Sequence, residues 1–306
     1  MDYFDLHCDT ISECERTGQG LAENPFALSL SRGRVFDRWA QVFALFIPDR
    51  MRGEAAFEHA RRLYTCFRAE LERNSSRAAF CRNMQEIGRA GREKKCACLL
   101  SIEGGSALGG EVDNVRYFYG LGVRLLTLTW DGRNELGGGS KSSGGLTRYG
   151  EAVLAAMERC GMAVDVSHLN EETFWEVYRR THTPLIATHS DCFGCWPHTR
   201  NLRDEQLRAV IRRGGLIGLN LYPEFLGPGD PVERIRANIL HLCALGGEDH
   251  IAFGCDFDGA PMPRGLGHVD DMAQLYRALA ERGLPEKLLA KCFYANARSR
   301  LGQIMG

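Results

Sequence analysis

The sequence has almost no excess of charge of either sign. Its 38 Lys and Arg residues balance 39 Asp and Glu residues, which gives a formal net charge of −1 over 306 residues. A nucleic acid or an anionic membrane selects a basic surface, so we expect neither as the main partner. The chain also lacks an apolar run long enough to cross a bilayer, and no signal-peptide pattern precedes its first apolar segment. These absences favour a globular protein of the cytoplasm.

Cysteine is frequent, with 12 residues, but the spacing lacks the compactness of a small disulfide framework. In a chain without an export signal we expect mostly reduced thiols. The C-x-x-C pair Cys192 and Cys195 lacks the second half of a zinc knuckle. The glycine-rich segment 137–145 (GGGSKSSGG) lacks the Gly directly before Lys that a phosphate-binding P-loop has. We therefore expect that segment to be an active-site or surface loop.

Short apolar runs alternate with longer amphipathic segments along the chain. Eight runs have the length and residue types of buried strands, at 3–7, 40–46, 96–102, 123–129, 162–167, 184–188, 215–221 and 251–256. Helical patterns lie at 54–73, 82–93, 111–120, 147–160, 170–181, 203–213, 231–245, 269–282 and from 285 onward. This repetition predicts a (β/α)8 TIM barrel, an α/β fold, over residues 1–306 as one domain. A doubly wound open sheet is the alternative, but the glycine-rich nucleotide turn typical of that fold does not follow the first strand.

Polar residues follow five of the predicted strands, at the rim where a TIM barrel carries its chemistry. His7 and Asp9 close the first strand and, two positions apart, project to the same face. The residues that close the later strands are Glu103, His168, His189 and Asp256. Each residue alone has a structural explanation, such as a hydrogen-bonded histidine or a carboxylate that begins a turn. Together they bring three imidazoles and three carboxylates to one rim.

This set of side chains is typical of a metal site. Imidazole and carboxylate without thiolate suit a catalytic Zn²⁺, with Mn²⁺ and Fe²⁺ as alternatives. Four or five ligands exceed what one open zinc site needs, whereas a binuclear site with a shared carboxylate and metals roughly 3.5 Å apart accommodates them. Among the remaining histidines, His198 lies near enough to the rim to be a candidate for contact with a substrate.

Seven segments carry a resemblance to a known family: DLHCDT, SIEGG, GVRLLTLTW, DVSHLN, ATHSD, RNLRDEQL and GCDFDG. Their order and spacing, nearly end to end, resemble those of the membrane dipeptidase (renal dipeptidase-like) family, zinc metallopeptidases with an amidohydrolase-type barrel. The resemblance implies that His7 and Asp9 bind one Zn²⁺, that His168 and His189 bind a second, and that Glu103 bridges the two. By analogy it also implies a homodimer.

The resemblance further implies the residues that act on the substrate, a small dipeptide. Asp256 matches the catalytic acid/base, which takes a proton from a metal-bridging water and passes it to the leaving amine. Arg200 matches an arginine that binds the C-terminal carboxylate, and Tyr222 matches a tyrosine of the same pocket. One position departs from the family: mammalian members have a histidine where this chain has Trp130, whose indole offers only an N–H. Either the metals alone polarise the carbonyl, or another donor such as Asn134 does so, or the substrate differs.

Three functions are compatible with these residues. The leading expectation is a zinc-dependent dipeptidase in which a metal-bridging hydroxide attacks the peptide bond. The first alternative keeps the metal site but acts on a cyclic amide, lactam, N-acyl amino acid or phosphoester, because Trp130 alters the carbonyl side of the pocket. The second is a non-catalytic metal-binding barrel, which the retention of every ligand and of Asp256 argues against.

Overall fold

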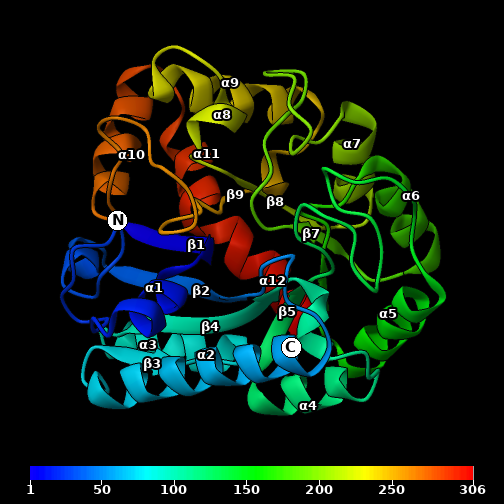
Figure 1. Cartoon of the computed structure of the whole chain (residues 1–306). Coiled ribbons are helices and arrows are strands. Elements are labelled where there is room, and N and C mark those ends of the chain that lie inside the picture. The colour runs from blue at the N-terminus through cyan, green and yellow to red at the C-terminus, as the bar shows by residue number, and fades with distance from the viewer. Residues whose placement is uncertain (306) are drawn as a thin grey trace.

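The computed structural model describes residues 1–305 and shows parallel strands surrounded by helices (Figure 1); Gly306, the last residue of the predicted domain, lies outside this range. The strands are β1 (Asp2–Cys8), β2 (Arg38–Phe46), β3 (Ala78–Phe80), β4 (Cys96–Glu103), β5 (Val123–Thr127), β6 (Ala163–Asp165), β7 (Leu185–Ala187), β8 (Leu216–Leu219) and β9 (Ile251–Phe253). Because β2 pairs with both β1 and β4, eight of them close into a ring. The predicted TIM barrel is confirmed, and the open sheet is excluded.

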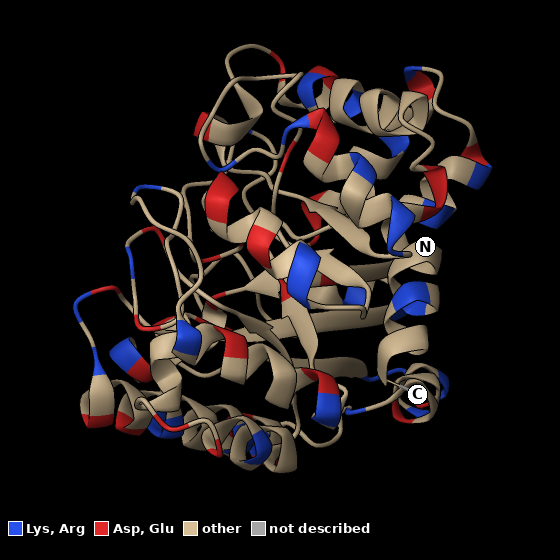
Figure 2. Ribbon diagram, turned by 90° about the vertical axis from the view of Figure 1, so that its right-hand side faces the viewer, with Lys and Arg blue, Asp and Glu red and all other residues tan. Residues whose placement is uncertain are grey.

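The helices follow the predicted pattern with few differences. They are α1 (Thr10–Thr17), α2 (Gly53–Arg73), α3 (Met84–Arg92), α4 (Asn114–Leu121), α5 (Arg148–Cys160), α6 (Glu171–Arg180), α7 (Asp204–Arg212), α8 (Pro223–Leu226), α9 (Pro231–Ala244), α10 (Asp271–Glu281), α11 (Glu286–Ala290) and α12 (Asn296–Met305). Charged side chains of both signs are interspersed on these outer helices (Figure 2). Within residues 1–305, no helix has both the length and the apolarity required to cross a bilayer.

The sequence analysis missed α1, α8 and β3, of which α8 is a single turn of four residues. The strand β3 has three residues and pairs with the start of β4, beside the closed ring. A run this short has no periodicity that distinguishes it from a loop. The helix α1 has eight residues and ends at Gly18, which adopts a left-handed conformation (φ 73°). All three elements are local additions and leave the order of the barrel strands unchanged.

Small and branched apolar side chains fill the inside of the barrel at its N-terminal end. Each of the eight ring strands contributes to one buried cluster, with members such as Phe4, Val42, Leu99 and Ile186. Ala297 and Leu301 of α12 belong to the same cluster, so this helix covers the N-terminal end. The opposite end, where the strands finish, is left for the polar residues.

Candidate metal centre and active site

The five predicted ligands lie together at the C-terminal end of the barrel. His7 is in β1 and Asp9 directly follows it, Glu103 ends β4, and His168 and His189 follow β6 and β7. All five are buried, with exposed fractions between 0% and 7%. The strand-end pattern therefore predicted correctly which side chains the barrel brings together.

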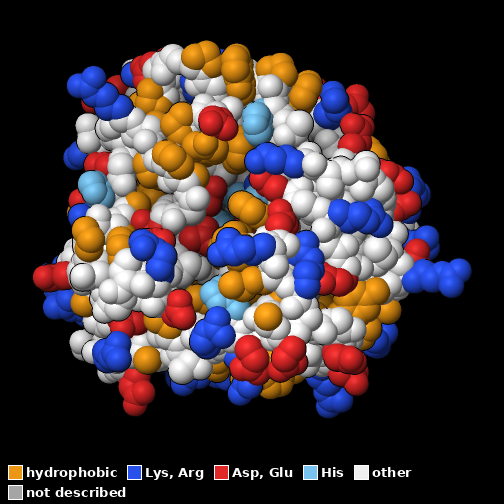
Figure 3. Space-filling view, in the orientation of Figure 1, with side chains coloured by type: hydrophobic (Ala, Val, Ile, Leu, Met, Phe, Trp, Pro, Cys, Tyr) orange, Lys and Arg blue, Asp and Glu red, His pale blue; other side chains and the backbone are white. Residues whose placement is uncertain are grey.

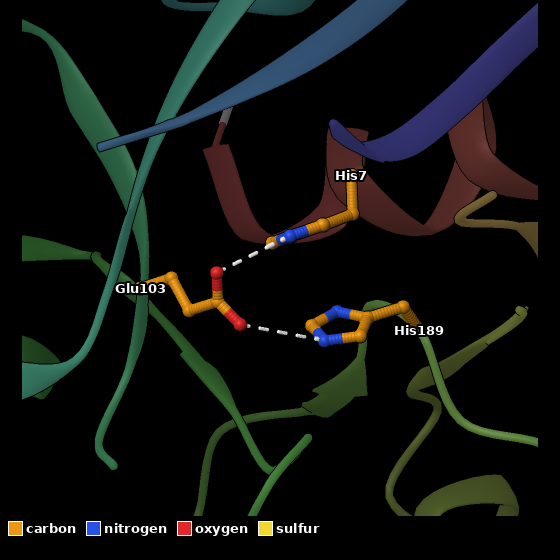
Figure 4. A group of neighbouring side chains, drawn as sticks. All are labelled: His7, Glu103 and His189. Atoms are coloured by element: carbon orange, nitrogen blue, oxygen red, sulfur yellow. Dashed lines mark ion pairs between the residues drawn. The ribbon is translucent and has the colours of Figure 1, made fainter. Parts of the chain in front are cut away.

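The carboxylate of Glu103 lies between two groups of ligands and turns one oxygen to each. Its Oε2 is 3.4 Å from Nε2 of His7. Its Oε1 is 2.8 Å from Nε2 of His168 and 3.6 Å from Nε2 of His189. Figure 4 shows two of these contacts: one carboxylate oxygen of Glu103 faces His7 and the other faces His189. This is the arrangement required of a carboxylate shared between two metal ions.

The Nε2 atoms of His168 and His189 lie only 2.8 Å apart. The Nδ1 atom of His168 is 2.9 Å from Oδ1 of Asp131. The Nδ1 atom of His189 is 2.8 Å from the hydroxyl of Thr188, which in turn donates to Asp165 over 2.6 Å. Burial lowers the pKa of His189 well below its ordinary value, so its imidazole is neutral. With each Nδ1 engaged, both Nε2 atoms are available to a metal ion.

The second group consists of His7, Asp9 and Asp256. Nε2 of His7 is 3.3 Å from Oδ2 of Asp9 and 3.7 Å from Oδ1 of Asp256. The other oxygen of Asp9, Oδ1, is buried and has no hydrogen-bond partner among the described residues. Oδ2 of Asp256 accepts a hydrogen bond from the Asn220 amide over 3.1 Å. A buried oxygen without a partner is costly, and coordination to a cation would satisfy it.

The electrostatics of these groups also fit a cation. Burial and the neighbouring Glu103 raise the pKa of Asp9 to about 7. Burial also raises the pKa of Asp256, and the positive charge of His7 partly offsets this increase. Burial would raise the pKa of Glu103 as well, but His7 and His168 hold it well below its usual range. Three buried carboxylates that face one another repel, and a divalent ion relieves this repulsion. The donor set therefore fits a metal site.

The backbone around the site is strained. His168 (φ 67°), Asp256 (φ 63°) and Asp258 (φ 67°) adopt left-handed conformations that residues with a Cβ rarely take. At Gly259, a Cβ atom would lie 2.2 Å from Oδ2 of Asp9 and 2.5 Å from Oδ1 of Asp256. Strands β6 and β9 end earlier than predicted because the chain leaves the pleated conformation to aim these side chains. Strain of this kind clusters at functional sites.

A cavity of about 230 Å³ opens onto the metal centre. Figure 3 shows a hollow near the middle of this face, with histidine and acidic side chains in it. The residues that line the cavity are Trp130, Asp131, Lys141, His168, His198, Arg200, Tyr222, Glu224, Phe225, Asp256, Gly259, Ala260 and Pro261. The structure thus places the candidate substrate residues Trp130, His198, Arg200 and Tyr222 at the cavity, beside Asp256.

Neighbouring residues hold the guanidinium of Arg200 in place, and one of its N–H donors makes no hydrogen bond with the described residues. The residue is only 3% exposed. Its Nη2 donates to the carbonyl of His189 over 3.2 Å, and its Cζ lies 5.3 Å from the centre of the Phe225 ring. Its Nε is buried and has no hydrogen-bond partner within residues 1–305. Tyr222 packs its ring edge-on against the same Phe225. This arrangement presents a rigid cation to a ligand in the cavity.

The structure does not bring Asn134 to the cavity. Its Nδ2 donates to the carbonyl of Leu128 over 2.7 Å, and its Oδ1 accepts from the backbone N–H groups of Leu136 and Gly137. These bonds hold the loop after β5. Trp130, in contrast, lines the cavity and packs edge-on against Phe46, with 5.1 Å between the ring centres.

Asp131 and Asn220 are among the polar residues that contact the site and were missed by the sequence analysis. Asp131 accepts from His168, and Asn220 donates to Asp256. Asp131 is the first charged residue after β5, and Asn220 directly follows β8. The strand-end rule would have found both if it had been extended from metal ligands to every polar residue that closes a strand.

Comparison with known proteins places the chain in a family. The sequence model of the family described as "Membrane dipeptidase (Peptidase family M19)" matches residues 1–303 of the chain. The chain belongs to the membrane dipeptidase family. It is 34% identical over 240 residues to the Klebsiella pneumoniae protein described as "Uncharacterized protein in pqqA 5'region", a match that covers 74% of this chain and 89% of that protein. It is also 32% identical to dipeptidase aclJ of Aspergillus oryzae. That match covers 69% of this chain and about half (52%) of the Aspergillus protein.

Solved structures of other membrane dipeptidase family members have the same fold. The chain superposes on the structure of dipeptidase AC, a metallo peptidase, with a TM-score of 0.94 and 28% sequence identity. The superposition covers 100% of this chain and 99% of dipeptidase AC. A metallo peptidase from Rhodobacter sphaeroides, liganded with a phosphinate mimic of L-Ala-D-Ala, superposes with a TM-score of 0.93 at 26% identity over the same shares. The protein is accordingly a metallo-dipeptidase family hydrolase that acts on peptide bonds.

Proposed function

We propose that this membrane dipeptidase family member is a binuclear zinc dipeptidase that requires a free C-terminal carboxylate on its substrate. The proposal rests mainly on the orientation of the Glu103 carboxylate. Its Oε2 faces His7, and its Oε1 faces His168 and His189. His7 and Asp9 would hold one ion, His168 and His189 the other, and Glu103 both. When bound, two such ions supply a nucleophilic water at neutral pH and a Lewis acid for the carbonyl.

In this proposal Asp256 moves the proton. It follows the last barrel strand, lines the cavity and has one oxygen toward His7 and the other held by Asn220. Because burial raises its pKa above the ordinary carboxylate value, the group accepts a proton more readily than an exposed aspartate and can return it. It would take the proton of the attacking water and deliver it to the leaving amine. The Asn220 amide keeps the carboxylate oriented for both steps.

The role of Arg200 is to bind the substrate's carboxylate. A guanidinium matches a carboxylate with two parallel hydrogen bonds and stays charged at any working pH. The place of Arg200 in the cavity wall and its Nε, which makes no hydrogen bond in the part of the chain that the structure describes and lies 4.0 Å from Oδ1 of Asp131, support this role. The size of the cavity, about 230 Å³, suits a substrate of two small residues. The dipeptide mimic bound by the Rhodobacter sphaeroides relative supports a dipeptide here too.

A second candidate function follows from Trp130. Its ring stands at the cavity beside His168, with 6.3 Å between the ring centres, and can donate only one N–H. A changed carbonyl side could favour a cyclic amide, a lactam or an N-acyl amino acid over a dipeptide. In all of these the metal centre and Asp256 would act in the same way.

The proposal is tested by metal analysis together with a substrate panel. The purified protein should bind two equivalents of Zn²⁺ and hydrolyse L-L or L-D dipeptides, with kcat/KM well above that for the same dipeptides amidated at the C-terminus. The panel should include a cyclic dipeptide and N-acyl amino acids. Faster hydrolysis of those compounds would favour the second function, and no hydrolysis by a protein reconstituted with two metals would refute both.

A further inference from the structure

One buried carboxylate at the site has no role in the proposed reaction. Asp131 follows β5, and its side chain is 14% exposed. Its Oδ1 accepts from Nδ1 of His168 and from the hydroxyl of Ser140, both over 2.9 Å. Its Oδ2 lies 2.7 Å from Nζ of Lys141. Three donors from two segments of the chain thus converge on one carboxylate, and Nε of Arg200 lies 4.0 Å from the same Oδ1.

Two of these donors belong to the glycine-rich loop 137–145, and the backbone holds the same loop in place. The Lys141 N–H donates to the carbonyl of Asp131 over 2.8 Å, and the Gly139 N–H donates to the carbonyl of Gly132 over 3.1 Å. A Cβ at Gly139 would lie 2.0 Å from the carbonyl oxygen of Trp130, so only glycine permits this close approach. The loop is therefore packed along residues 130–132.

We propose that Asp131 is a positioning residue for the metal centre, and that the glycine-rich loop holds its carboxylate in the required place. The hydrogen bond to Asp131 places the proton of His168 on Nδ1 and fixes the plane of the ring. The ring then directs Nε2 toward the space between His189 and Glu103. This Nε2 lies 2.8 Å from Nε2 of His189 and 2.8 Å from Oε1 of Glu103. A carboxylate behind a ligating histidine also makes that histidine a stronger donor.

The two histidines of this group are supported in different ways. His189 rests on the hydroxyl of Thr188, which is buried below the cavity and bonded to Asp165. His168 rests on Asp131, which is part of the cavity wall. The support of His168 therefore depends on a loop at the surface, whereas the support of His189 is built into the barrel. This difference predicts that changes in the loop alter the affinity of one metal position and spare the other.

The inference rests on the proposed two-metal centre and is tested by metal affinity. Zn²⁺ affinity would be measured by competition with a chromophoric chelator, and Co²⁺ substitution would report the ligand geometry through its visible absorption. Asp131→Ala should weaken one of the two equivalents by about 10–100-fold and leave the other unchanged. Asp131→Asn keeps an oxygen that can accept from Nδ1–H, so it should recover part of the affinity and the wild-type shape of the Co²⁺ spectrum.

Lys141→Met is the matched control. It removes one of the loop's donors to Asp131 but leaves Ser140 and the contact with His168, so it should weaken the same equivalent by no more than about threefold and leave the other unchanged. Equal affinities for wild type and Asp131→Ala would overturn the inference, as would an equally large loss in Lys141→Met. If Asp131→Ala does not fold, Asp131→Asn decides: a partial loss of affinity at one equivalent alone would support the positioning role, and affinities identical to wild type at both would contradict it.

The proposed function and this inference fail in different ways. Wild-type protein that binds fewer than two equivalents refutes the binuclear centre. Asp131→Ala still decides the inference in that case, since the remaining equivalent is either weakened, which supports the positioning role, or unchanged, which refutes it. Two equivalents of unchanged affinity in the variant refute the positioning role alone.

Discussion

Replacement of Arg200 by alanine tests the recognition of the substrate most directly. The guanidinium is 3% exposed and held by the carbonyl of His189, and its buried Nε makes no hydrogen bond within the described chain but lies 4.0 Å from Oδ1 of Asp131. A hydrogen bond to a charged group contributes about 1.5–3 kcal/mol. Two such bonds to a carboxylate, partly offset by desolvation, should contribute roughly 3–4 kcal/mol. Arg200→Ala should therefore lower kcat/KM by about 10²–10³-fold.

The assay compares a dipeptide with the same dipeptide amidated at its C-terminus, for wild type and variant. Wild type should prefer the free carboxylate by about 10²–10³-fold, on the same hydrogen-bond energies, and Arg200→Ala should lose that preference. Arg200→Lys keeps the charge but not the planar fork, so it should recover only part of the activity. Metal content and thermal unfolding of each variant serve as controls. An unchanged preference for the free carboxylate in Arg200→Ala would refute the reasoning.

Three further predictions concern the metal centre. Asp256→Asn should lower kcat by about 10²–10⁴-fold with unchanged metal content, which steady-state kinetics and metal analysis would check; wild-type rates would exclude a role in proton transfer. Gly259→Ala should lower activity by at least about tenfold, because its Cβ would meet carboxylate oxygens of Asp9 and Asp256 at 2.2 and 2.5 Å; metal analysis would show whether the ions are lost as well. Burial raises the pKa of Asp9 to about 7, so below that pH a proton occupies the ligand and above it the carboxylate is free. Zn²⁺ affinity should therefore rise with pH by about tenfold per unit for each proton displaced, and the rise should continue above pH 7 because His7, whose pKa Glu103 and Asp9 raise well above its ordinary value despite burial, must also lose a proton; affinity independent of pH between 5 and 7 would contradict this assignment.

The order of the barrel strands could be predicted because apolar runs and amphipathic segments alternate regularly. Their ends could not be predicted as well. The runs 162–167 and 251–256 were predicted as continuous strands, yet β6 stops at Asp165 and β9 at Phe253. The side chains that follow are apolar enough to continue a strand, and the turn depends on strained conformations at His168 and Asp256 that residue types do not reveal.

Side chains in a strand or within three residues of its end were easier to predict than those farther along a loop. His7 and Glu103 lie in strands, and His189 and His168 follow β7 and β6 by two and three residues. Asp131 and Asn134 both lie in the segment after β5. Asn134 was predicted to face the substrate and instead bonds to the backbone, while Asp131 contacts His168. Which of two polar loop residues faces inward depends on packing that spans the chain.

The left-handed residues of the site have a consequence for the evolution of the fold. A residue with a Cβ in this conformation costs about 1–2 kcal/mol relative to a relaxed one, and His168, Asp256 and Asp258 each carry such a cost. Glycine would relieve the strain at each position, although its greater freedom in the unfolded chain offsets part of the gain. Selection for heat resistance alone would therefore favour glycine at 168 and 256, the positions of a metal ligand and of the proposed acid/base. Histidine at 168 and aspartate at 256 therefore carry a cost in stability, which the roles of metal ligand and acid/base proposed for them would explain.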